Sequence, residues 1–315
     1  MSRLSEKEII SIFQKNLNNK ISEDVEIFTI GKKFGIIKID TLVQSTDIPK
    51  IMSPEQIANK SMVGPLSDFA AKGVIPKHGI ISVSLPKKYP KYKLVRLANG
   101  FKKASKKFGV KILGGDTNQA KEIIISIMLF GISEKIIPRN GARIGDIIIT
   151  TGKFGMTGAG LGIILNKNKS SKKFRKDAIN SVVLPKPQLQ FGVLASRYCS
   201  SSMDSSDGLS TTLTEMSRSS KKKFVITKIP IADGLEEFAR INHKSVLDLV
   251  FNSGEEYEIV LTVSQKNISK IKKIANSCKI QIFEIGYVKS GSGVFLQKNN
   301  KKIKITDNGW EHFRN

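Results

Sequence analysis

The feature that most constrains the fold of this chain is the alternation of extended apolar runs with helical patterns over its first 140 residues. Extended runs occupy residues 25–30, 34–43, 79–85 and 122–132, and helical spacing of apolar side chains occupies residues 54–72 and 91–108. Strands that alternate with helices build a sheet with helices packed on it. The sequence therefore predicts an α/β unit, of the α+β type, in this part of the chain.

A second block follows a turn-rich segment at residues 138–145. It begins with an apolar run at residues 146–151, and helices are expected at residues 157–165, 187–197, 208–217, 244–250 and 264–276. Strands are expected near residues 224, 259, 283 and 294. Because 315 residues exceed the roughly 100 to 200 of a typical single domain, we predict two α/β domains, 1–140 and 141–315.

Several protein classes lack support in the sequence. The longest apolar run, residues 123–132, has about half of the ~20 residues that span a bilayer, so no membrane span is predicted. Two cysteines, Cys199 and Cys278, cannot staple a chain of this length, and with no secretory signal a cytoplasmic location is expected. The three histidines show neither zinc-ligand spacing nor a triad partner.

Glycine-rich nucleotide loops are also excluded. No Walker A sequence, Gly-x-x-x-x-Gly-Lys-Ser/Thr, occurs in the chain. Glycines at positions 155, 158, 160 and 162 follow an expected strand, but their spacing is not that of a dinucleotide site. We interpret them as a tight strand-to-helix turn with Thr157 available as the helix cap.

Charge is the one composition feature that suggests a different function. Lys plus Arg number 52 against 27 Asp plus Glu, a formal net charge of +25, which raises nucleic-acid binding as an alternative. Only nine of the 52 are arginines, the residue best suited to reading guanine, and the lysines are scattered. The pattern favours a solvated lysine-rich surface that attracts anionic substrates, with no specific nucleic acid expected.

The acidic residues carry more information, because several lie beside Gly, Ser or Thr at the ends of apolar runs. They are Glu23, Asp24, Asp40, Asp68, Asp116, Asp204, Asp207, Glu255 and Glu256. Each alone is typical of a helix cap or turn, and we expect them in loops. Together they predict a hard-metal cluster, and oxygen ligands without histidine suit several Mg²⁺ ions that bridge carboxylates to substrate phosphates.

An ordered set of short motifs resembles the thiamine-monophosphate kinase family, in the aminoimidazole ribonucleotide synthetase-like superfamily. The motifs are Asp40-Thr41-Leu42-Val43, Ser67-Asp68-Phe69-Ala70-Ala71, Gly114-Gly115-Asp116-Thr117, Arg139 with Gly141, Asp204-Ser205-Ser206-Asp207-Gly208, Ser253-Gly254-Glu255-Glu256 and Gly309-Trp310-Glu311-His312-Phe313. They run from about residue 21 to 313. Selenophosphate synthetase is disfavoured because no cysteine precedes Cys199, and the hydrogenase-maturation dehydratase because the chain lacks a terminal cysteine.

The resemblance implies a two-domain fold, a homodimer formed by pairing of the N-terminal sheets, and an ATP site without a P-loop. It implies ATP-dependent phosphorylation of thiamine monophosphate to thiamine diphosphate, by direct in-line transfer assisted by Mg²⁺. Another superfamily enzyme with a different acceptor stays open as an alternative. The implied magnesium ligands are Asp24, Asp40, Asp68, Asp116, Asp204 and Asp207; the implied ATP contacts are Gly115, Asp116, Arg139 and Ser206; and the implied substrate contacts are Asp47, Glu255 and Trp310.

Three departures from the family pattern affect these implied roles. The family's Gly-Asp-Asp loop is Ser22-Glu23-Asp24 here, which lengthens one carboxylate. The family's Ser-Thr-Asp is Lys38-Ile39-Asp40, which removes a hydroxyl ligand. A substrate-side histidine is Asp47, an anion that suits a cationic thiamine.

Overall fold

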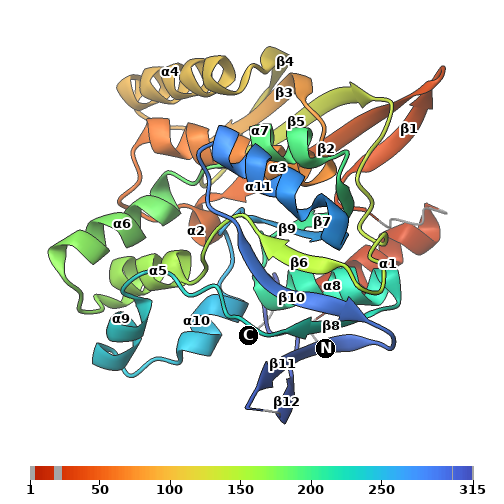
Figure 1. Cartoon of the computed structure of the whole chain (residues 1–315). Helices are drawn as coiled ribbons and strands as arrows, with labels where there is room; N and C mark the ends of the chain where they lie inside the picture. The colour runs from red at the N-terminus through yellow and green to blue at the C-terminus, as the bar shows by residue number, and fades with distance from the viewer. Residues whose placement is uncertain (1–3, 18–22, 300, 314–315) are drawn as a thin grey trace.

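A five-stranded sheet forms the first half of the structure, a computed structural model that describes residues 4–17, 23–299 and 301–313 (Figure 1). Its strands are β1 (Glu26–Ile30), β2 (Lys33–Val43), β3 (Pro76–Leu85), β4 (Lys111–Gln119) and β5 (Ile124–Ser133). They lie in the order β1-β2-β5-β3-β4, and neighbours are antiparallel except β3 and β4, which are parallel. Ser22 of the predicted acidic loop lies outside the described residues.

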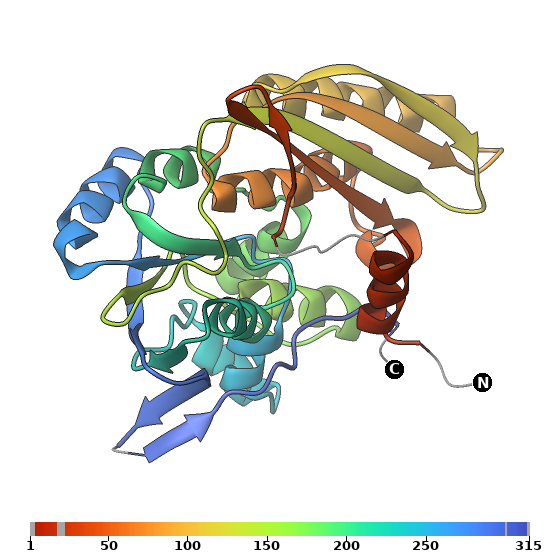
Figure 2. The ribbon, with the colours of Figure 1, turned by 90° about the vertical axis from the view of Figure 1, so that its right-hand side faces the viewer.

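Helices cover one face of this sheet and leave the other face open. The covering helices are α3 (Pro54–Lys72) and α4 (Lys91–Phe108). In Figure 2 the strands lie in front of α4, and their uncovered face is turned toward the viewer. Local sequence explains α3: Ser53 and Gln56 form a capping box at its start, and Gly73, at φ +69°, ends it in the left-handed conformation.

A seven-stranded sheet forms the second half, with the order β12-β11-β8-β10-β6-β9-β7. Its strands are β6 (Ile147–Thr150), β7 (Cys199–Asp204), β8 (Lys223–Ile226), β9 (Ile259–Val263), β10 (Phe283–Lys289), β11 (Gly293–Lys298) and β12 (Lys301–Lys304). The remaining helices are α1 (Glu6–Asn16), α2 (Gln44–Asp47), α5 (Met156–Asn166), α6 (Lys172–Val183), α7 (Leu189–Ala195), α8 (Leu209–Ser220), α9 (Leu235–Ile241), α10 (Val246–Asn252) and α11 (Ile268–Ser277), with a 3-10 turn at Gln265–Asn267.

Helix α3 lies between the two sheets, packing on β2 and β5 of the first and on β7 and β9 of the second. Fifteen of its 19 residues are buried, although three of those fifteen are charged. On the side of the second sheet α3 meets α7 at close range, because a Cβ at Gly192 would lie 1.9 Å from the carbonyl oxygen of Ala70. Polar side chains of α3 that point into this layer therefore have little water around them.

The sequence predicted the α/β architecture and several elements correctly. The bounds of α3 and α4 agree with the prediction, and each predicted strand has a counterpart. Six elements were missed: strands β4, β7 and β12 and helices α2, α6 and α9 were not expected. The expectation that the key aspartates lie in loops was also wrong, because Asp40, Asp116 and Asp204 are in strands and Asp68 is in α3.

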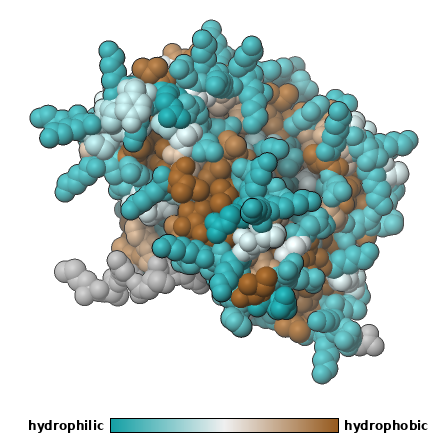
Figure 3. All heavy atoms as spheres, turned by 90° about the vertical axis from the view of Figure 1, so that its left-hand side faces the viewer, coloured by the Kyte–Doolittle hydropathy of each residue, from teal (hydrophilic) through white to brown (hydrophobic). Residues whose placement is uncertain are grey.

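Hydrophilic side chains dominate the face that carries α4, α5 and α6, with apolar area exposed between them (Figure 3). This agrees with the lysine-rich composition. In the part of the chain that the structure describes, no helix is both long enough and apolar enough to cross a membrane. The two cysteines are free thiols.

Candidate active site

Two neighbouring aspartates meet where β2 packs on α3. Asp40 points from β2 toward the helix, since a Cβ at Gly64 of α3 would lie 2.9 Å from its Oδ2 atom. Asp68 is one helical turn further along α3 and is buried. The ammonium of Lys38, on the same strand face as Asp40, lies 3.0 Å from Asp68 Oδ2 and 3.4 Å from Asp40 Oδ1. One cation therefore bridges two predicted metal ligands.

The end of β7 and the turn after it add Asp204 and Asp207. Burial first, then the charge of Asp24, raises the pKa of Asp204 to about 7. Burial and the charge of Glu6 raise the pKa of Asp207 to about 6. The positive charge of Lys38 opposes the rise in the pKa of both Asp204 and Asp207. We call Asp40, Asp68, Asp204 and Asp207 the acidic cluster.

Asp68 shows how crowded the acidic cluster is. Burial is the main cause that raises the pKa of Asp68 well above its ordinary range. The charge of Lys38 opposes this rise, and the charges of Asp204 and Asp40 add to it. Lys38 has a raised pKa despite its own burial, because Asp68 and Asp40 stabilise its charged form. Among the described residues, the ammonium of Lys38 contacts Asp40 and Asp68, so two of the four carboxylates share one cation and this part of the site is short of positive charge.

Asp24 lies in a different environment. Its carboxylate pairs with the Lys72 ammonium, 2.7 Å away, and with the Arg139 guanidinium. Glu23 also contacts the Lys72 ammonium, at 2.6 Å, and accepts the backbone N–H of Arg139 at 3.0 Å. Burial alone would raise the pKa of Asp24, but Lys72 and Arg139 lower it below its usual value. We call Glu23, Asp24, Lys72 and Arg139 the ion-pair cluster.

Asp116 is not brought to either cluster within this chain. In the sheet register it lies in one row with Ser82, Ser126 and Thr41, whose hydroxyl is 2.8 Å from that of Ser126. Residues in one row of a sheet point to the same face. Thr41 follows Asp40 on β2, so the two side chains point to opposite faces. Asp116 shares the row of Thr41 and therefore points to the open face, opposite Asp40. Three strand spacings, about 14 Å, separate Asp116 from Thr41. Gly115 precedes it on the same edge strand.

The predicted substrate residues come together beside the acidic cluster. Glu255 and Trp310 are both hydrogen-bonded to the turn after β7. Glu255 donates its N–H to the Ser206 carbonyl at 2.5 Å, and Trp310 donates its N–H to the Asp207 carbonyl at 2.8 Å. Trp310 is 56% exposed, and its ring meets the His312 ring edge to face, with the centroids 6.0 Å apart. Helix α1 holds the C-terminal segment that carries Trp310, because His312 donates its N–H to the Glu6 carboxylate at 3.0 Å. In Figure 2 the first and the last described segments of the chain accordingly lie close together.

Asp47 reaches this region through a lysine that sequence reasoning missed. The ammonium of Lys60, buried on α3, lies 2.7 Å from Glu255 and donates to the backbone carbonyl of Asp47 at 2.8 Å. The Asp47 carboxylate accepts the Val43 N–H at 2.7 Å. Burial raises the pKa of Glu255, and Lys60 opposes that rise. Lys60 thus joins the Glu255 carboxylate to the backbone of Asp47.

Lys38, Lys60 and Lys72 contact carboxylates of the candidate site, and sequence reasoning missed these contacts. Lysine is usually solvated, so a composition-based reading places it on the surface. A signal did exist: Lys38 is two residues before Asp40 and hence on its strand face, and Lys72 is one helical turn after Asp68.

The glycine-rich turn before α5 is a structural feature, as predicted, but its cap is different. Gly155, at φ +99°, is the N-cap, so the expectation that Thr157 caps the helix was wrong. The Glu256 carboxylate accepts the N–H groups of Gly155 at 2.7 Å and Thr157 at 3.2 Å. A side-chain carboxylate therefore occupies this helix N-terminus.

The donor set of the acidic cluster fits a hard divalent cation, because it offers carboxylate groups, two of them on the buried side chains of Asp68 and Asp204, with little positive charge beside them. Within residues 4–17, 23–299 and 301–313, however, no group of three or more acidic, histidine or cysteine side chains is already arranged to hold a metal ion. Asp24 does not fit as a direct ligand, since both of its oxygens contact cations. Oxygens from a bound phosphate would complete the coordination that the aspartates lack.

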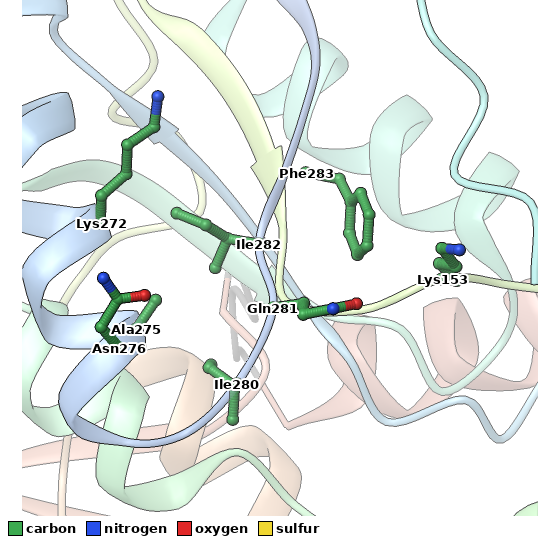
Figure 4. A pocket seen from close by; sticks show the side chains of 8 residues that line it. All are labelled: Lys153, Lys272, Ala275, Asn276, Ile280, Gln281, Ile282 and Phe283. Carbon is green, nitrogen blue, oxygen red and sulfur yellow. The ribbon is translucent and has the colours of Figure 1, made fainter.

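A pocket of about 490 Å³ lies away from all of these residues. It is lined by residues of α11, by the segment 280–282 that follows, by Phe283 of β10 and by Lys153, as Figure 4 shows. Its lysines are engaged elsewhere, Lys272 with Glu284 at 2.6 Å and Lys153 with Asp233. None of the predicted site residues lines it, so the acidic cluster and its neighbours are the better candidate site.

Known proteins match the chain along its whole length. The model of the AIR synthase related protein N-terminal domain matches residues 22–133, and the model of the C-terminal domain matches residues 143–299. The thiamine-monophosphate kinase of Nitrosopumilus maritimus is 54% identical over 314 residues, all of both chains, and that of Pyrococcus horikoshii is 32% identical over all of this chain and 98% of its own. The solved structure of AaThiL complexed with AMPPCP and TMP has a TM-score of 0.88, 26% identity and 99% coverage of both chains. This chain therefore belongs to the thiamine-monophosphate kinase family of AIR synthase related proteins.

Proposed function

We propose that this protein transfers the γ-phosphoryl group of ATP to thiamine monophosphate, forming thiamine diphosphate and ADP. The observation that carries the proposal is the 54% identity to a thiamine-monophosphate kinase over the whole of both chains. The geometry supports it, because an acidic cluster suited to a cation lies beside an exposed tryptophan and Glu255.

The chemistry requires positioning more than proton transfer. The acceptor is a phosphate monoester whose second pKa is about 6, so at pH 7 its oxygen is largely deprotonated and needs no strong base. The obstacle is repulsion between two polyanions, since unit like charges ~4 Å apart repel by about 4 kcal/mol at an effective dielectric constant near 20. In-line transfer follows once the charges are neutralised and the two substrates are aligned, with no phosphoenzyme required.

The proposed residue roles divide the site in two. Asp40, Asp68, Asp204 and Asp207 would hold Mg²⁺, and bound Mg²⁺ would neutralise and orient the transferring phosphoryl group. Asp24 would act on the metals through water or through its ion pairs. Ser206 and Arg139 would contact ATP, and Arg139 has a buried Nε–H without a hydrogen-bond partner, which leaves it a donor for phosphate.

The substrate side is proposed to bind the thiamine moiety. Trp310 would place its ring against the thiazolium, since an aromatic face attracts a permanent cation. Glu255 would accept hydrogen bonds from the ring substituents, and Asp47 would add negative charge. Because Lys60 already pairs with Glu255, the tryptophan face is the main contact with the thiazolium charge.

We also propose that the protein is a homodimer joined through the open faces of its N-terminal sheets. That face exposes large apolar side chains, including Ile39 at 61% and Ile80 at 42%. Gly115 and Asp116 are on the strand at its edge, and Asp116 points out from it, so in a dimer they could serve a site formed with the partner subunit. Light scattering at micromolar protein should give about 70 kDa; a monomer of about 35 kDa would count against it.

Two further predictions stay open as parts of this proposal. The boundary between the two domains is proposed near residue 140, in the segment between β5 and β6. The cytoplasmic location remains a prediction from the sequence.

An ADP-release assay tests the proposed function. With Mg-ATP alone, ADP release should be slow, and adding thiamine monophosphate should increase it at least tenfold. Binding of Mg-ATP without any response to thiamine monophosphate would point to a different acceptor. Salt-dependent binding of DNA or RNA with no ATP turnover would favour a nucleic-acid-binding protein instead.

A further inference from the structure

Lys38 is in an unusual position for a lysine. It lies on β2, an inner strand between β1 and β5, and its side chain enters the layer between the sheet and α3, where only 25% of it is exposed. Its ammonium is 3.0 Å from Asp68 Oδ2 and 3.4 Å from Asp40 Oδ1. The two carboxylates approach it from different elements, one from the strand and one from the helix.

Asp204 and Asp207 belong to the same cluster, at the end of β7 and in the turn that follows. The ammonium of Lys38 makes its contacts with Asp40 and Asp68, and its charge also opposes the rise in the pKa of Asp204 and Asp207. Lys72 and Arg139, by contrast, contact the carboxylates of the ion-pair cluster.

An ammonium and a divalent cation cannot readily share these oxygens. Mg²⁺ requires oxygen ligands at about 2.1 Å in octahedral geometry, whereas Lys38 contacts the same carboxylates at 3.0 and 3.4 Å. A metal bound directly between Asp40 and Asp68 would lie within a few ångströms of a like charge, and the Asp68 side chain, 9% exposed, has little water to screen this repulsion.

We propose that the ammonium of Lys38 takes the place of one divalent cation in the acidic cluster, so that this chain neutralises its aspartates with one metal ion fewer than it would otherwise bind. The inference rests on the proposed function, because it concerns the same site. Lys38 is a positioning residue in this account: it fixes the Asp40 and Asp68 carboxylates, so that the four aspartates of the acidic cluster together coordinate one ion fewer.

The test counts bound Mn²⁺ by electron paramagnetic resonance, with metal-free protein and a non-hydrolysable ATP analogue. Lys38→Met removes the charge at similar length, Lys38→Ser restores the hydroxyl of the family motif, and Lys38→Arg keeps the charge. Lys33→Met is the matched control, since Lys33 is on the same strand but pairs at the surface with Glu134 at 3.6 Å. We expect Lys38→Met and Lys38→Ser to bind one more Mn²⁺ per chain than the wild type, the Lys38→Arg variant and the control.

Thermal unfolding supplies a second readout. Stabilisation by Mn²⁺ should be larger for Lys38→Ser than for wild type, because metal then replaces a lost charge. Equal Mn²⁺ counts in all five proteins would overturn the proposal. So would an unchanged count with a raised KM for ATP in Lys38→Met, since Lys38 would then contact the nucleotide.

The design separates this proposal from the proposed function. The Mn²⁺ count needs no thiamine monophosphate, and if Lys38→Met does not fold, the comparison of Lys38→Ser with Lys38→Arg still decides it. A wild-type protein that fails to form thiamine diphosphate, yet shows the expected difference in Mn²⁺ count, would contradict the kinase function and leave the role of Lys38 intact.

Discussion

The ion-pair cluster and the acidic cluster lie next to each other along the C-terminal turns of α3, where Lys72 is one helical turn after Asp68, and the carboxylates in the two clusters have opposite environments. In the ion-pair cluster two carboxylates meet two cations, and the pKa of Asp24 falls. In the acidic cluster Lys38 contacts two of the four carboxylates, and the pKa values of Asp68, Asp204 and Asp207 rise. The first has its charge balanced by the chain itself, whereas the second depends on cations from solution.

This difference separates stability from function. Buried charges that are already paired contribute to the fold only as long as both partners remain. Buried carboxylates that repel one another cost stability in the free protein and bind a divalent cation strongly when one is supplied. Substitutions in the two clusters should therefore affect different measurements.

The largest effect on stability is expected from Lys72→Met in the ion-pair cluster. The substitution leaves Glu23 and Asp24 with a buried excess of negative charge, which costs about 3 to 5 kcal/mol in the free energy of unfolding. Chemical denaturation of the metal-free protein measures it, with Lys33→Met as the exposed control. A loss below about 1 kcal/mol would mean that Arg139 alone balances this cluster.

The opposite outcome is expected for Asp68→Asn in the acidic cluster. Turnover should fall roughly 100- to 1,000-fold, the scale of losing one preorganised electrostatic contact, while the free energy of unfolding stays equal or rises. Asp233→Asn, whose carboxylate is 90% exposed, is the matched control. Near wild-type turnover at limiting Mg²⁺ would remove Asp68 from the proposed ligands.

A pH titration of stability sharpens the comparison at a smaller scale. Asp204 and Asp207 have pKa values of about 7 and 6 in the folded protein against 3.8 unperturbed, so between about pH 4 and 7 the folded state binds more protons than the unfolded state. Stability of the metal-free protein should therefore increase as the pH falls from 8 to 5, by on the order of 1 kcal/mol or more.

The variant Asp204→Asn provides the control for this titration. Its stability should change less between pH 8 and pH 5 than that of the wild type, because one of the protonating carboxylates is gone. Saturating Mg²⁺ should weaken the wild-type dependence as well. Identical pH dependence in the two metal-free proteins would show that Asp204 does not hold an excess proton.

The smallest effect is expected at the substrate side, for Trp310→Ala. A cation on an aromatic face is worth about 0.5 to 2 kcal/mol, so the KM for thiamine monophosphate should rise roughly 3- to 30-fold while the KM for ATP hardly changes. Trp310→Phe should keep most of the affinity. Equal weakening for both substrates, in steady-state kinetics that vary each separately, would give Trp310 a structural role.

Much of the fold could be predicted from local signals. Helix α3 has a capping box at Ser53 and a glycine after its last turn, and its predicted bounds agree with the structure. Strand β4 was missed because it is an exposed edge strand rich in Gly, Asp and Asn, residues with low strand propensity. Helix α6 was missed because it begins in a lysine-rich segment with few apolar side chains. Its apolar face is evident only near its end, where Val182 and Val183 pack into the hydrophobic core between α3 and the five-stranded sheet.

The site was harder to predict because charge compensation is a property of the folded chain. The aspartates are visible as short motifs, but their division into two clusters depends on where α3 places Lys72 and β2 places Lys38. The position of Asp116 depends on the pleat: the strand register turns it to the open face, away from Asp40. Short motifs in a sequence cannot distinguish these two faces.

The central claim is that this chain forms thiamine diphosphate with help from cations held by the acidic cluster, and phosphorus NMR of one reaction tests it most directly. With ATP, Mg²⁺ and thiamine monophosphate, the account predicts thiamine diphosphate and ADP in equal amounts, no reaction after EDTA, and recovery when Mg²⁺ is restored. Consumption of ATP without thiamine diphosphate, or product formation that EDTA leaves unchanged, would contradict it.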